Sequence, residues 1–507
     1  MKAPMTRATA LEDGTAMFWA AFTLLALVAV LPFWIGEYMP LVDLPQHAAQ
    51  LAVGEHWNDA SLRYHDYYRI NPYTNQRLGY LITHGFARFF PLVPALKCLL
   101  SLSVWGLAAA VYWLVRTVKG DPWWSLLAFP AAYSFSMYWG LLNYLVALPL
   151  GICLVVASTR FALAPSRGRA LLVLIVANGL FLAHALILAY AGLVSAMVVL
   201  IRAPRLRDKL LGCAALASIL PTVAWWWRAI RTHEPSTAAT SVESGFGWHR
   251  LPQLFSYQIS SAENSFPQAI AGAVLCLLPF LLGARLTRER WRLLPLVVTL
   301  LLFFTVPAAA LDIDLLYGRV AAFALPALLF ALDGRMSQRW QRGVLASLVG
   351  AKLLLVVAQF RAFDTEAQPL NRVLAAAQPG KRLLYLPTDS KSAFVPHEAY
   401  SHFGCFYQVK VGGVADYSFA ELFPTWYRYR ANVEPRLPKE FDSNTQHFRF
   451  DLHDGKRFDY LLVRGPVLDA WFAGSQTIPA VVAHAAEWTL LQVPRATPVE
   501  AQARITP

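Results

Sequence analysis

An acid and an imidazole stand close together directly after the first long apolar run of the chain. Asp43 and His47 are four residues apart, so they would share one face of a helix over residues 43 to 57. A carboxylate at the water boundary can act as a general base, and a neighbouring imidazole can assist it. The pattern therefore predicts Asp43 and His47 as catalytic residues.

The same stretch also has a purely structural interpretation. Asp43 is followed by Pro45 in the first turn and by Gln46 three residues on, which is the pattern of a helix start. There the Asp oxygen merely accepts backbone N–H groups, and the local sequence leaves both roles open. The predicted helix has a polar face, with His47 and Gln50, and an apolar face, so we expect it to lie at the bilayer surface.

Side chains that could hold a phosphate occur in the same loop and at the start of a late apolar helix. Arg can bind phosphate oxygens through two parallel N–H groups, and Tyr offers an amphipathic surface to a lipid or a sugar. The alternative for each such residue is an ordinary interfacial position that contacts lipid headgroups. The residues predicted to bind a phosphate are Arg319, Arg77, Arg69 and Tyr317.

Two further polar residues, Asn143 and His184, fall within or beside apolar runs. An unpaired polar group is costly in hydrocarbon, so each should face a neighbouring helix or a polar cavity. Packing between helices is the commoner role. A place in a polar cavity is the functional alternative, and the sequence leaves it open.

The composition is that of a polytopic membrane protein. Of the 507 residues, 57% are hydrophobic and 15% are charged, and the mean hydropathy is +0.42. The net charge of +13 would suggest nucleic-acid binding in a soluble protein. Here most Lys and Arg residues fall in short loops between apolar runs, where they set the topology. We therefore expect no nucleic acid among the partners.

Apolar runs of roughly twenty residues predict about eleven membrane helices. They lie near residues 16–36, 92–115, 123–139, 141–159, 170–184, 185–201, 210–229, 266–284, 293–311, 319–333 and 343–360. Every second loop is rich in Lys and Arg, so these loops should share the cytoplasmic side, together with the N-terminus. The loops 36–91 and 230–265 and the turn 312–314 then lie on the external side.

From about residue 361 the composition becomes that of a soluble domain. Strand-like runs occur at 382–386, 403–411, 458–463 and 488–493. We expect a small external α/β domain over 361–507, after a membrane module over 1–360. The domain contains no Gly-rich phosphate loop, nucleophile elbow or HExxH motif, so it shows no catalytic motif of its own.

The order of these parts resembles the GT-C superfamily of glycosyltransferases that use polyprenyl-phosphate sugars. The shared features are a long external loop that opens with an acid, many further spans and a C-terminal external domain. The acid falls on Asp43, and Tyr317-Gly318-Arg319 is similar to the start of a late helix in the protein-mannosyl and aminoarabinose transferase type. Many members carry two adjacent acids in this loop, whereas Leu44 follows Asp43 here.

The resemblance implies an inverting hexosyl or pentosyl transferase of the bacterial inner membrane, with a periplasmic C-terminal domain. Its partners would be a polyprenyl-phosphate sugar, membrane lipids and a glycan, lipid or protein acceptor, which the C-terminal domain would help to bind. It fixes no cofactor; a divalent cation, Mg²⁺ or Mn²⁺, held by Asp43 is compatible with it.

Two other classes of protein stay open at this stage. One is a transporter or flippase of a lipid-linked substrate, although the sequence shows no clear internal repeat. The other is a noncatalytic membrane scaffold, in which Asp43 would be a helix cap only.

Overall fold

The computed structural model describes residues 7–233, 247–261, 265–310, 315–421, 425–431, 433 and 444–494, with side chains from residue 15 onward. The chain divides into two compact units. Unit 1 comprises Met1–Ile35, Asn75–Phe86 and Lys97–Phe360, and unit 2 comprises Gly36–Thr74, Ala87–Leu96 and Arg361–Pro507. Most of the loop 36–91, which the sequence analysis assigned to the membrane module, therefore belongs to the same compact unit as the C-terminal segment.

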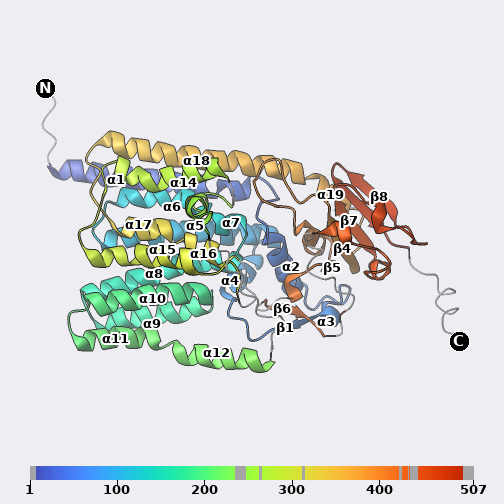
Figure 1. Ribbon diagram of the computed structural model, residues 1–507, viewed down its shortest axis with the longest axis horizontal. Coiled ribbons are helices and arrows are strands. Elements are labelled where there is room, and N and C mark those ends of the chain that lie inside the picture. Colours follow the sequence, from blue (N-terminus) through green and yellow to red (C-terminus); the bar gives the residue numbers. More distant parts are fainter. Residues whose placement is uncertain are drawn as a thin grey trace. The chain divides into compact units, whose positions relative to one another are not determined.

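Unit 1 is built from helices that run along the bundle (Figure 1). Its longer helices are α1 (Arg7–Trp34), α5 (Leu92–Thr117), α8 (Leu142–Leu163), α9 (Arg167–Phe181), α10 (Ala185–Arg202), α11 (Leu206–Ala217), α12 (Leu220–His233), α14 (Phe266–Leu281), α15 (Leu294–Thr305) and α18 (Arg339–Ala367). The first residues of α5, up to Leu96, and the last residues of α18, from Arg361, belong to unit 2. Its shorter helices are α4 (Leu78–Ala87), α6 (Ala128–Ala132), α7 (Phe135–Tyr138), α13 (Arg250–Ser256), α16 (Leu316–Ala321) and α17 (Ala324–Phe330). The strands β2 (Arg285–Leu286) and β3 (Leu332–Asp333) form a small antiparallel pair.

Six helices of the described chain are long and apolar enough to cross a membrane: Thr15–Trp34, Leu92–Thr117, Leu142–Leu163, Ala185–Arg202, Leu206–Thr232 and Arg339–Leu374. The predicted count of about eleven is therefore not confirmed. The run 123–139 is broken into a 3₁₀ turn and two short helices, α6 and α7, and the run 319–333 is divided between α16 and α17. Helix α9 has 15 residues and is about 22 Å long, shorter than a hydrocarbon core of about 30 Å.

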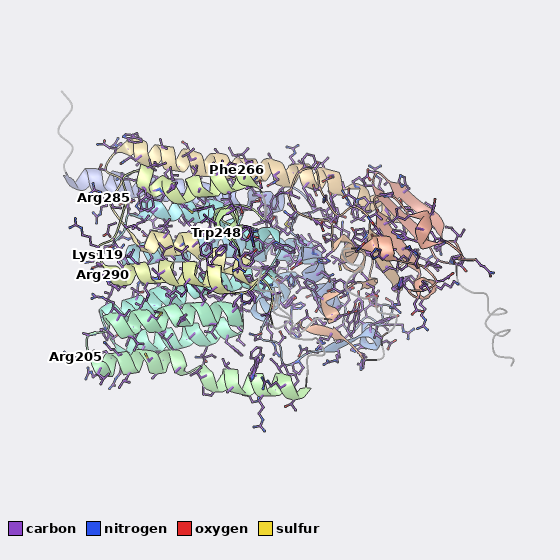
Figure 2. All side chains as sticks on the ribbon, viewed as in Figure 1. Lys119, Arg205, Trp248, Phe266, Arg285 and Arg290 are labelled. Carbon is purple, nitrogen blue, oxygen red and sulfur yellow. The ribbon has the colours of Figure 1, made fainter. Side chains whose placement is uncertain are left out.

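Basic residues of several loops gather at one end of unit 1. Figure 2 shows Lys119, Arg205, Arg285 and Arg290 at this end of the helices, although they come from three different loops. This agrees with the prediction that alternate loops share one side of the membrane. A polytopic membrane protein is thus supported by the helices, their apolar surface and the position of these cations.

Unit 2 contains a mixed five-stranded sheet. Its strands are β4 (Lys381–Pro387), β5 (Gly413–Asp416), β7 (Tyr460–Arg464), β8 (Ala480–Ala485) and β9 (Trp488–Gln492), in the order β5-β4-β7-β9-β8. Strand β4 runs parallel to β5 and β7, while β9 runs antiparallel to β7 and β8. The expected small α/β fold is present. Of the four predicted strands, the run 403–411 is wrong, because it forms a 3₁₀ turn and the helix α20 (Phe406–Lys410).

Both faces of this sheet are covered. Along β4, Leu383 and Tyr385 point into one core with Phe363 of α18, while Leu384 and Leu386 point into a second core. The alternation follows from the two-residue period of a strand. The helix α19 (Pro369–Leu374) packs on the first face. A strand that is apolar on both sides reads as one continuous hydrophobic run, which is why β4 was predictable from sequence.

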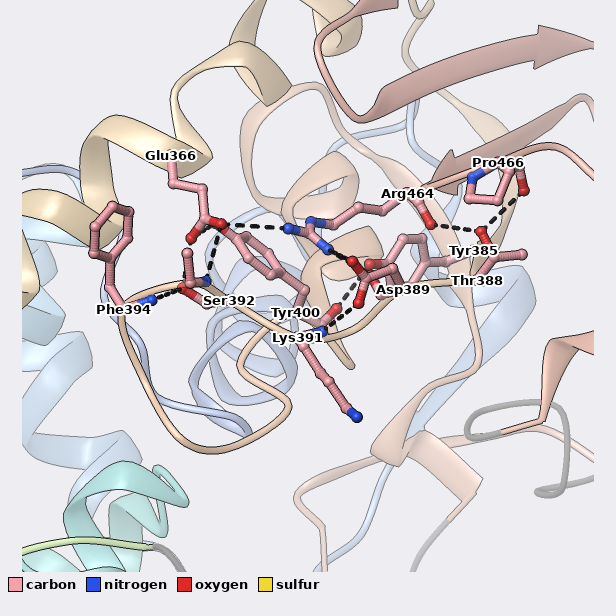
Figure 3. A network of polar contacts seen from close by, with 11 residues as sticks. Glu366, Tyr385, Thr388, Asp389, Lys391, Ser392, Phe394, Tyr400, Arg464 and Pro466 are labelled. Carbon is pink, nitrogen blue, oxygen red and sulfur yellow. Dashed lines mark hydrogen bonds and ion pairs between the residues drawn. The ribbon is translucent and has the colours of Figure 1, made fainter. Parts of the chain in front are cut away.

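A buried arginine joins the end of α18 to this sheet (Figure 3). The guanidinium of Arg464, at the end of β7, lies 3.7 Å from the carboxylate of Glu366 and 3.5 Å from that of Asp389. It also stacks on the ring of Tyr400, with Cζ 3.7 Å from the ring centroid. The Tyr400 hydroxyl donates to Glu366. Because the buried cation has both carboxylate and aromatic partners, it can hold the helix end without an uncompensated charge.

Helix α2 (Leu44–Glu55) differs from the prediction of a helix at the bilayer surface. Ten of its twelve residues are buried, so both its polar and its apolar face are covered. Gln46 donates to the carbonyl of Tyr417 and accepts from the backbone N–H of Phe419. Gln50 accepts from the backbone N–H of Tyr427. The polar face is therefore paired with the C-terminal chain rather than with water or headgroups.

The first loop and the C-terminal segment are also joined by backbone pairing. Strand β1 (Tyr68–Ile70) pairs antiparallel with β6 (Tyr427–Tyr429). The aromatic residues of both strands, together with Val53 of α2, form a further core of unit 2. Loop 36–74 is thus an integral part of unit 2.

We expect Gln46→Leu to destabilise unit 2 by about 1 to 3 kcal/mol, because it removes two hydrogen bonds to part-buried backbone groups at about 0.5–1.5 kcal/mol each. Thermal unfolding of the purified protein in detergent would measure the loss. Gln446→Leu is the matched control, since the Gln446 side chain is exposed. Equal melting temperatures for the two variants would contradict the role assigned to Gln46.

Candidate active site

Asp43 occupies the position before the first residue of α2, but it does not act as a side-chain cap. Its backbone has φ −88° and ψ −6°, and within the described chain its carboxylate accepts no capping hydrogen bond from α2. The carboxylate Oδ1 instead lies 3.5 Å from Nε2 of His402, and the side chains are 14% and 9% exposed respectively. The structural alternative for Asp43 therefore loses its main support, and the carboxylate is available for chemistry.

The segment between α1 and Asp43 is fixed by a second carboxylate. The backbone N–H groups of Glu37 and Tyr38 both donate to Asp364 Oδ1, at 2.7 and 2.8 Å. A side chain at Gly36 would place its Cβ 2.4 Å from Asp364 Cγ, so the close approach requires glycine. Lys410 then pairs with the Glu37 carboxylate at 2.5 Å. Burial lowers the pKa of Lys410, and Glu37 opposes this shift.

His47 is placed near the same region of unit 2. It is buried, and its ring meets the ring of Phe419 edge-on at 5.8 Å. The ring of His402 approaches Phe419 at 5.6 Å. Phe419 therefore contacts both imidazoles, and Asp43, His47 and His402 come from neighbouring parts of one cluster. His402 was not predicted, because no local pattern relates it to Asp43; only its position before a 3₁₀ turn, η3 (Phe403–Cys405), brings it there.

A second cluster, in unit 1, gathers three residues singled out from the sequence. The rings of Tyr144 and His184 meet edge-on at 5.5 Å. The Tyr144 hydroxyl donates to the backbone carbonyl of Arg319. Asn143, next to Tyr144, is buried and accepts from the backbone N–H of Gly79 at 3.2 Å.

Arg77 is anchored beside this cluster. The backbone N–H groups of Arg77 and Leu78 both donate to the carbonyl of Leu182, two residues before His184. A side chain at Gly79, whose N–H binds Asn143, would place its Cβ 2.6 Å from the Asn143 amide oxygen and would displace that amide. The backbone of Arg77 thus lies close to the stretch that precedes His184, while the backbone of Arg319 binds Tyr144, whose ring contacts His184. Two guanidinium groups would suit an anion such as a phosphate, and the role of Arg77 and Arg319 in binding one stays a prediction.

The other two predicted phosphate ligands lie elsewhere. Tyr317 packs in an aromatic core: the Arg250 guanidinium lies 4.0 Å from its ring centroid, and its hydroxyl donates to Gln253 at 3.0 Å. Arg69 is in β1 of unit 2, opposite Arg428 of β6. Tyr317 therefore has a packing role that fully accounts for its position, while Arg69 belongs to a different unit from Arg77 and Arg319.

The described residues do not assemble an evident metal site. In the parts of the chain with defined coordinates, no group of three His, Cys, Asp or Glu side chains could hold a metal ion. Asp43 faces an imidazole rather than a set of oxygen ligands, which Mg²⁺ would require. We derive no step through a metal ion, and the divalent cation stays a prediction.

Two stretches considered in the sequence lie outside the described residues. They are the turn 312–314 and, in the loop 230–265, residues 234–246 and 262–264.

Comparisons with known proteins identify a fold. No family model matches the chain, and no curated protein matches it. Among solved structures, ArnT from Cupriavidus metallidurans bound to undecaprenyl phosphate is similar with a TM-score of 0.50 and 12% sequence identity, over 94% of this chain and 98% of that chain. The chain therefore has the fold of this ArnT structure. A structure of ArnT from the same organism in the apo state is also found, with a TM-score of 0.42 and 13% identity over 95% and 98% of the chains.

This likeness confirms the predicted resemblance at the level of the fold. Identity of 12% is too low to transfer individual residues, so Asp43, His47, Arg319, Arg77 and the other predicted site residues stay predictions.

The segment before Asp43 should respond to pH through His397. Its Nε2 lies 2.9 Å from the carbonyl of Pro40, and burial lowers the pKa of His397 to about 4. An ordinary His pKa is about 6.5, so the unfolded chain binds this proton more readily between pH 4 and 6.5. The stability that the neutral His397 side chain contributes to the folded segment is therefore fully present above pH 6.5 and is lost as the pH falls towards 4.

We therefore expect amide hydrogen exchange at Tyr38, Met39 and Leu41 to accelerate as the pH is lowered from 7 to 4.5, after correction for intrinsic rates. The lowered pKa of His397 corresponds to at most about 3 kcal/mol of folding free energy. His397→Gln keeps a donor for the Pro40 carbonyl but cannot titrate, so it should lose most of this pH dependence. The same pH profile in both proteins would contradict the assignment.

Proposed function

We propose that this chain is a membrane glycosyltransferase that takes a sugar from a polyprenyl-phosphate donor. The observation that carries the proposal is the likeness to the ArnT structure bound to undecaprenyl phosphate, over 94% of the chain. A polyprenyl phosphate is the leaving group that such a donor releases. The proposed acceptor is a glycan, lipid or protein on the external face of a bacterial inner membrane, with the N-terminus in the cytoplasm and the C-terminal domain in the periplasm.

The proposed reaction is a displacement at the anomeric carbon of the donor sugar. An acceptor hydroxyl forms the new C–O bond while the bond between the sugar and the phosphate breaks, and the phosphate leaves with the electron pair. The hydroxyl proton passes to a base, for which we propose the Asp43 carboxylate. Attack from the side opposite the phosphate inverts the anomeric centre. A positioned base contributes typically about 10²- to 10⁴-fold to such a step.

The leaving phosphate needs cations as negative charge develops on it. We propose Arg319 and Arg77 for this role, because the Arg77 backbone binds the carbonyl of Leu182 close to His184, and the Arg319 backbone binds Tyr144, whose ring contacts His184. We propose that His47 assists Asp43. Arg69 and Tyr317 have less support, since one lies in a strand of unit 2 and the other in an aromatic core.

Asp43→Asn should lower sugar transfer from a polyprenyl-phosphate donor by about 10²- to 10⁴-fold at unchanged thermal stability. Asn retains the shape and hydrogen-bonding capacity of the side chain but is a poor base. The measurement is transfer by the purified protein in detergent or liposomes, with Asp43→Ala alongside. Asp66→Asn in the same loop is the matched control, because Asp66 is exposed and pairs locally with Arg63. An active Asp43→Asn variant would remove Asp43 from the mechanism.

Arg319→Gln should lower kcat/KM for the donor by about 10- to 100-fold, because a charge-assisted contact to the phosphate is lost. Arg319→Lys keeps the charge but not the two parallel N–H groups, and it should fall between Gln and the wild type. Arg335→Gln, which removes an exposed arginine, serves as the control for net charge. If Arg319→Gln and Arg335→Gln have equal effects on donor kinetics, Arg319 does not bind the phosphate.

A further inference from the structure

We propose that His402 is a positioning residue for Asp43: its Nε2–H orients the Asp43 carboxylate for proton transfer. The proposal rests on the proposed function, because it needs Asp43 to act as the base. It gives the C-terminal segment a direct part in the reaction, beyond the binding of an acceptor that the sequence suggested. The carboxylate and the imidazole belong to the same compact unit, and their contact is described above.

The proton of the His402 ring can be assigned from its partner. A carboxylate only accepts hydrogen bonds, so the contact between Asp43 Oδ1 and His402 Nε2 is attractive only when Nε2 carries the proton. The distance of 3.5 Å is longer than an ordinary hydrogen bond. Catalytic contacts are often long without substrate and shorten in the reacting complex. Because the Nε2–H points at Oδ1, the other carboxylate oxygen of Asp43, Oδ2, would remain to take the proton from the hydroxyl group of the sugar acceptor.

The surroundings of His402 restrict the motion of its ring. The residue is buried, and its ring contacts Phe419 at 5.6 Å and Tyr417 at 6.3 Å. Tyr417 and Phe419 are also the residues whose backbone groups bind Gln46 in the first turn of α2. The short stretch from Tyr417 to Phe419 therefore contacts both the helix that begins directly after Asp43 and the imidazole ring that faces the Asp43 carboxylate. An arrangement of this kind fixes a carboxylate more narrowly than the helix alone would.

The backbone around Asp43 is held independently of His402. Asp364 binds the N–H groups of Glu37 and Tyr38, and His397 binds the Pro40 carbonyl. Loss of the His402 ring should therefore leave the loop in place while the side chain of Asp43 loses its orientation. This separation makes the proposal testable without unfolding the site.

The test compares His402→Gln with His402→Asn in the transfer assay. The amide nitrogen of Gln reaches about the position of Nε2, whereas the shorter Asn side chain cannot place an N–H there. We expect His402→Gln to retain activity within about fivefold of the wild type. We expect His402→Asn to lower kcat by about 10- to 100-fold with KM values within about twofold, since misplacement of a reacting group by about 1 Å can cost about 10²-fold.

His484→Ala is the matched control for the loss of a histidine in the same unit. The His484 Nδ1 lies 3.0 Å from the hydroxyl of Thr489 in the sheet, and its removal should leave kcat unchanged. Equal kcat values for His402→Gln and His402→Asn, whether both high or both low, would overturn the positioning role. Thermal stability and the retention of donor binding, measured with the free polyprenyl phosphate, accompany each kcat.

Failure of this inference is distinguishable from failure of the proposed function. An active wild type whose Asp43→Asn variant is dead, with His402→Gln and His402→Asn alike, keeps the glycosyltransferase and rejects His402. A folded wild type that transfers no sugar from any polyprenyl-phosphate donor rejects the proposed function, and the inference falls with it.

Discussion

The burial of helix α2 depends on two glutamines whose amides replace water. A helix with a polar face gains nothing from entering a protein interior unless every polar group there finds a partner. Gln46 and Gln50 bind the backbone of the C-terminal chain at Tyr417, Phe419 and Tyr427. In the other direction, the Gln408 amide donates to the carbonyl of Ala49. These hydrogen bonds with the C-terminal chain of unit 2 therefore position the start of α2, and with it Asp43.

Charged groups hold unit 2 together at the points where chain segments enter it. Asp364 binds two successive N–H groups after Gly36, and Arg464 binds Glu366 two residues further along the same helix. Both carboxylates sit near the end of α18, which thereby contacts the entry of the first loop and the end of β7. A buried charge is tolerated when it has several partners, and removal of one partner leaves the others uncompensated. These contacts explain why the entry segment and the sheet can share one compact unit.

The residues suited to chemistry form two groups with different character. In unit 1, the backbones of Arg319 and Arg77 lie close to Tyr144 and to the stretch before His184. In unit 2, Asp43 faces His402, with His47 nearby across the ring of Phe419.

Composition, charge pattern and strand period were enough to predict a polytopic membrane protein with a small C-terminal α/β fold. Hydrocarbon tolerates long apolar helices and excludes Lys and Arg, so both leave a direct mark on the sequence. Strands β4, β7 and β9 were also predictable, because a strand buried on both faces is a continuous apolar run. Asp43 could be singled out since it directly follows the first apolar run.

Only the tertiary structure decided what surrounds Asp43. The partners of α2 come from residues 408–427, and a helix that is half polar looks the same in sequence whether water or a protein amide faces it. The run 403–411 has the β-branched and aromatic content of a strand, but its packing against α2 makes it helical, as tertiary contacts can override local preference. No local pattern in the sequence marks His402, because its partner, Asp43, lies far away along the chain and only the fold brings the two side chains together.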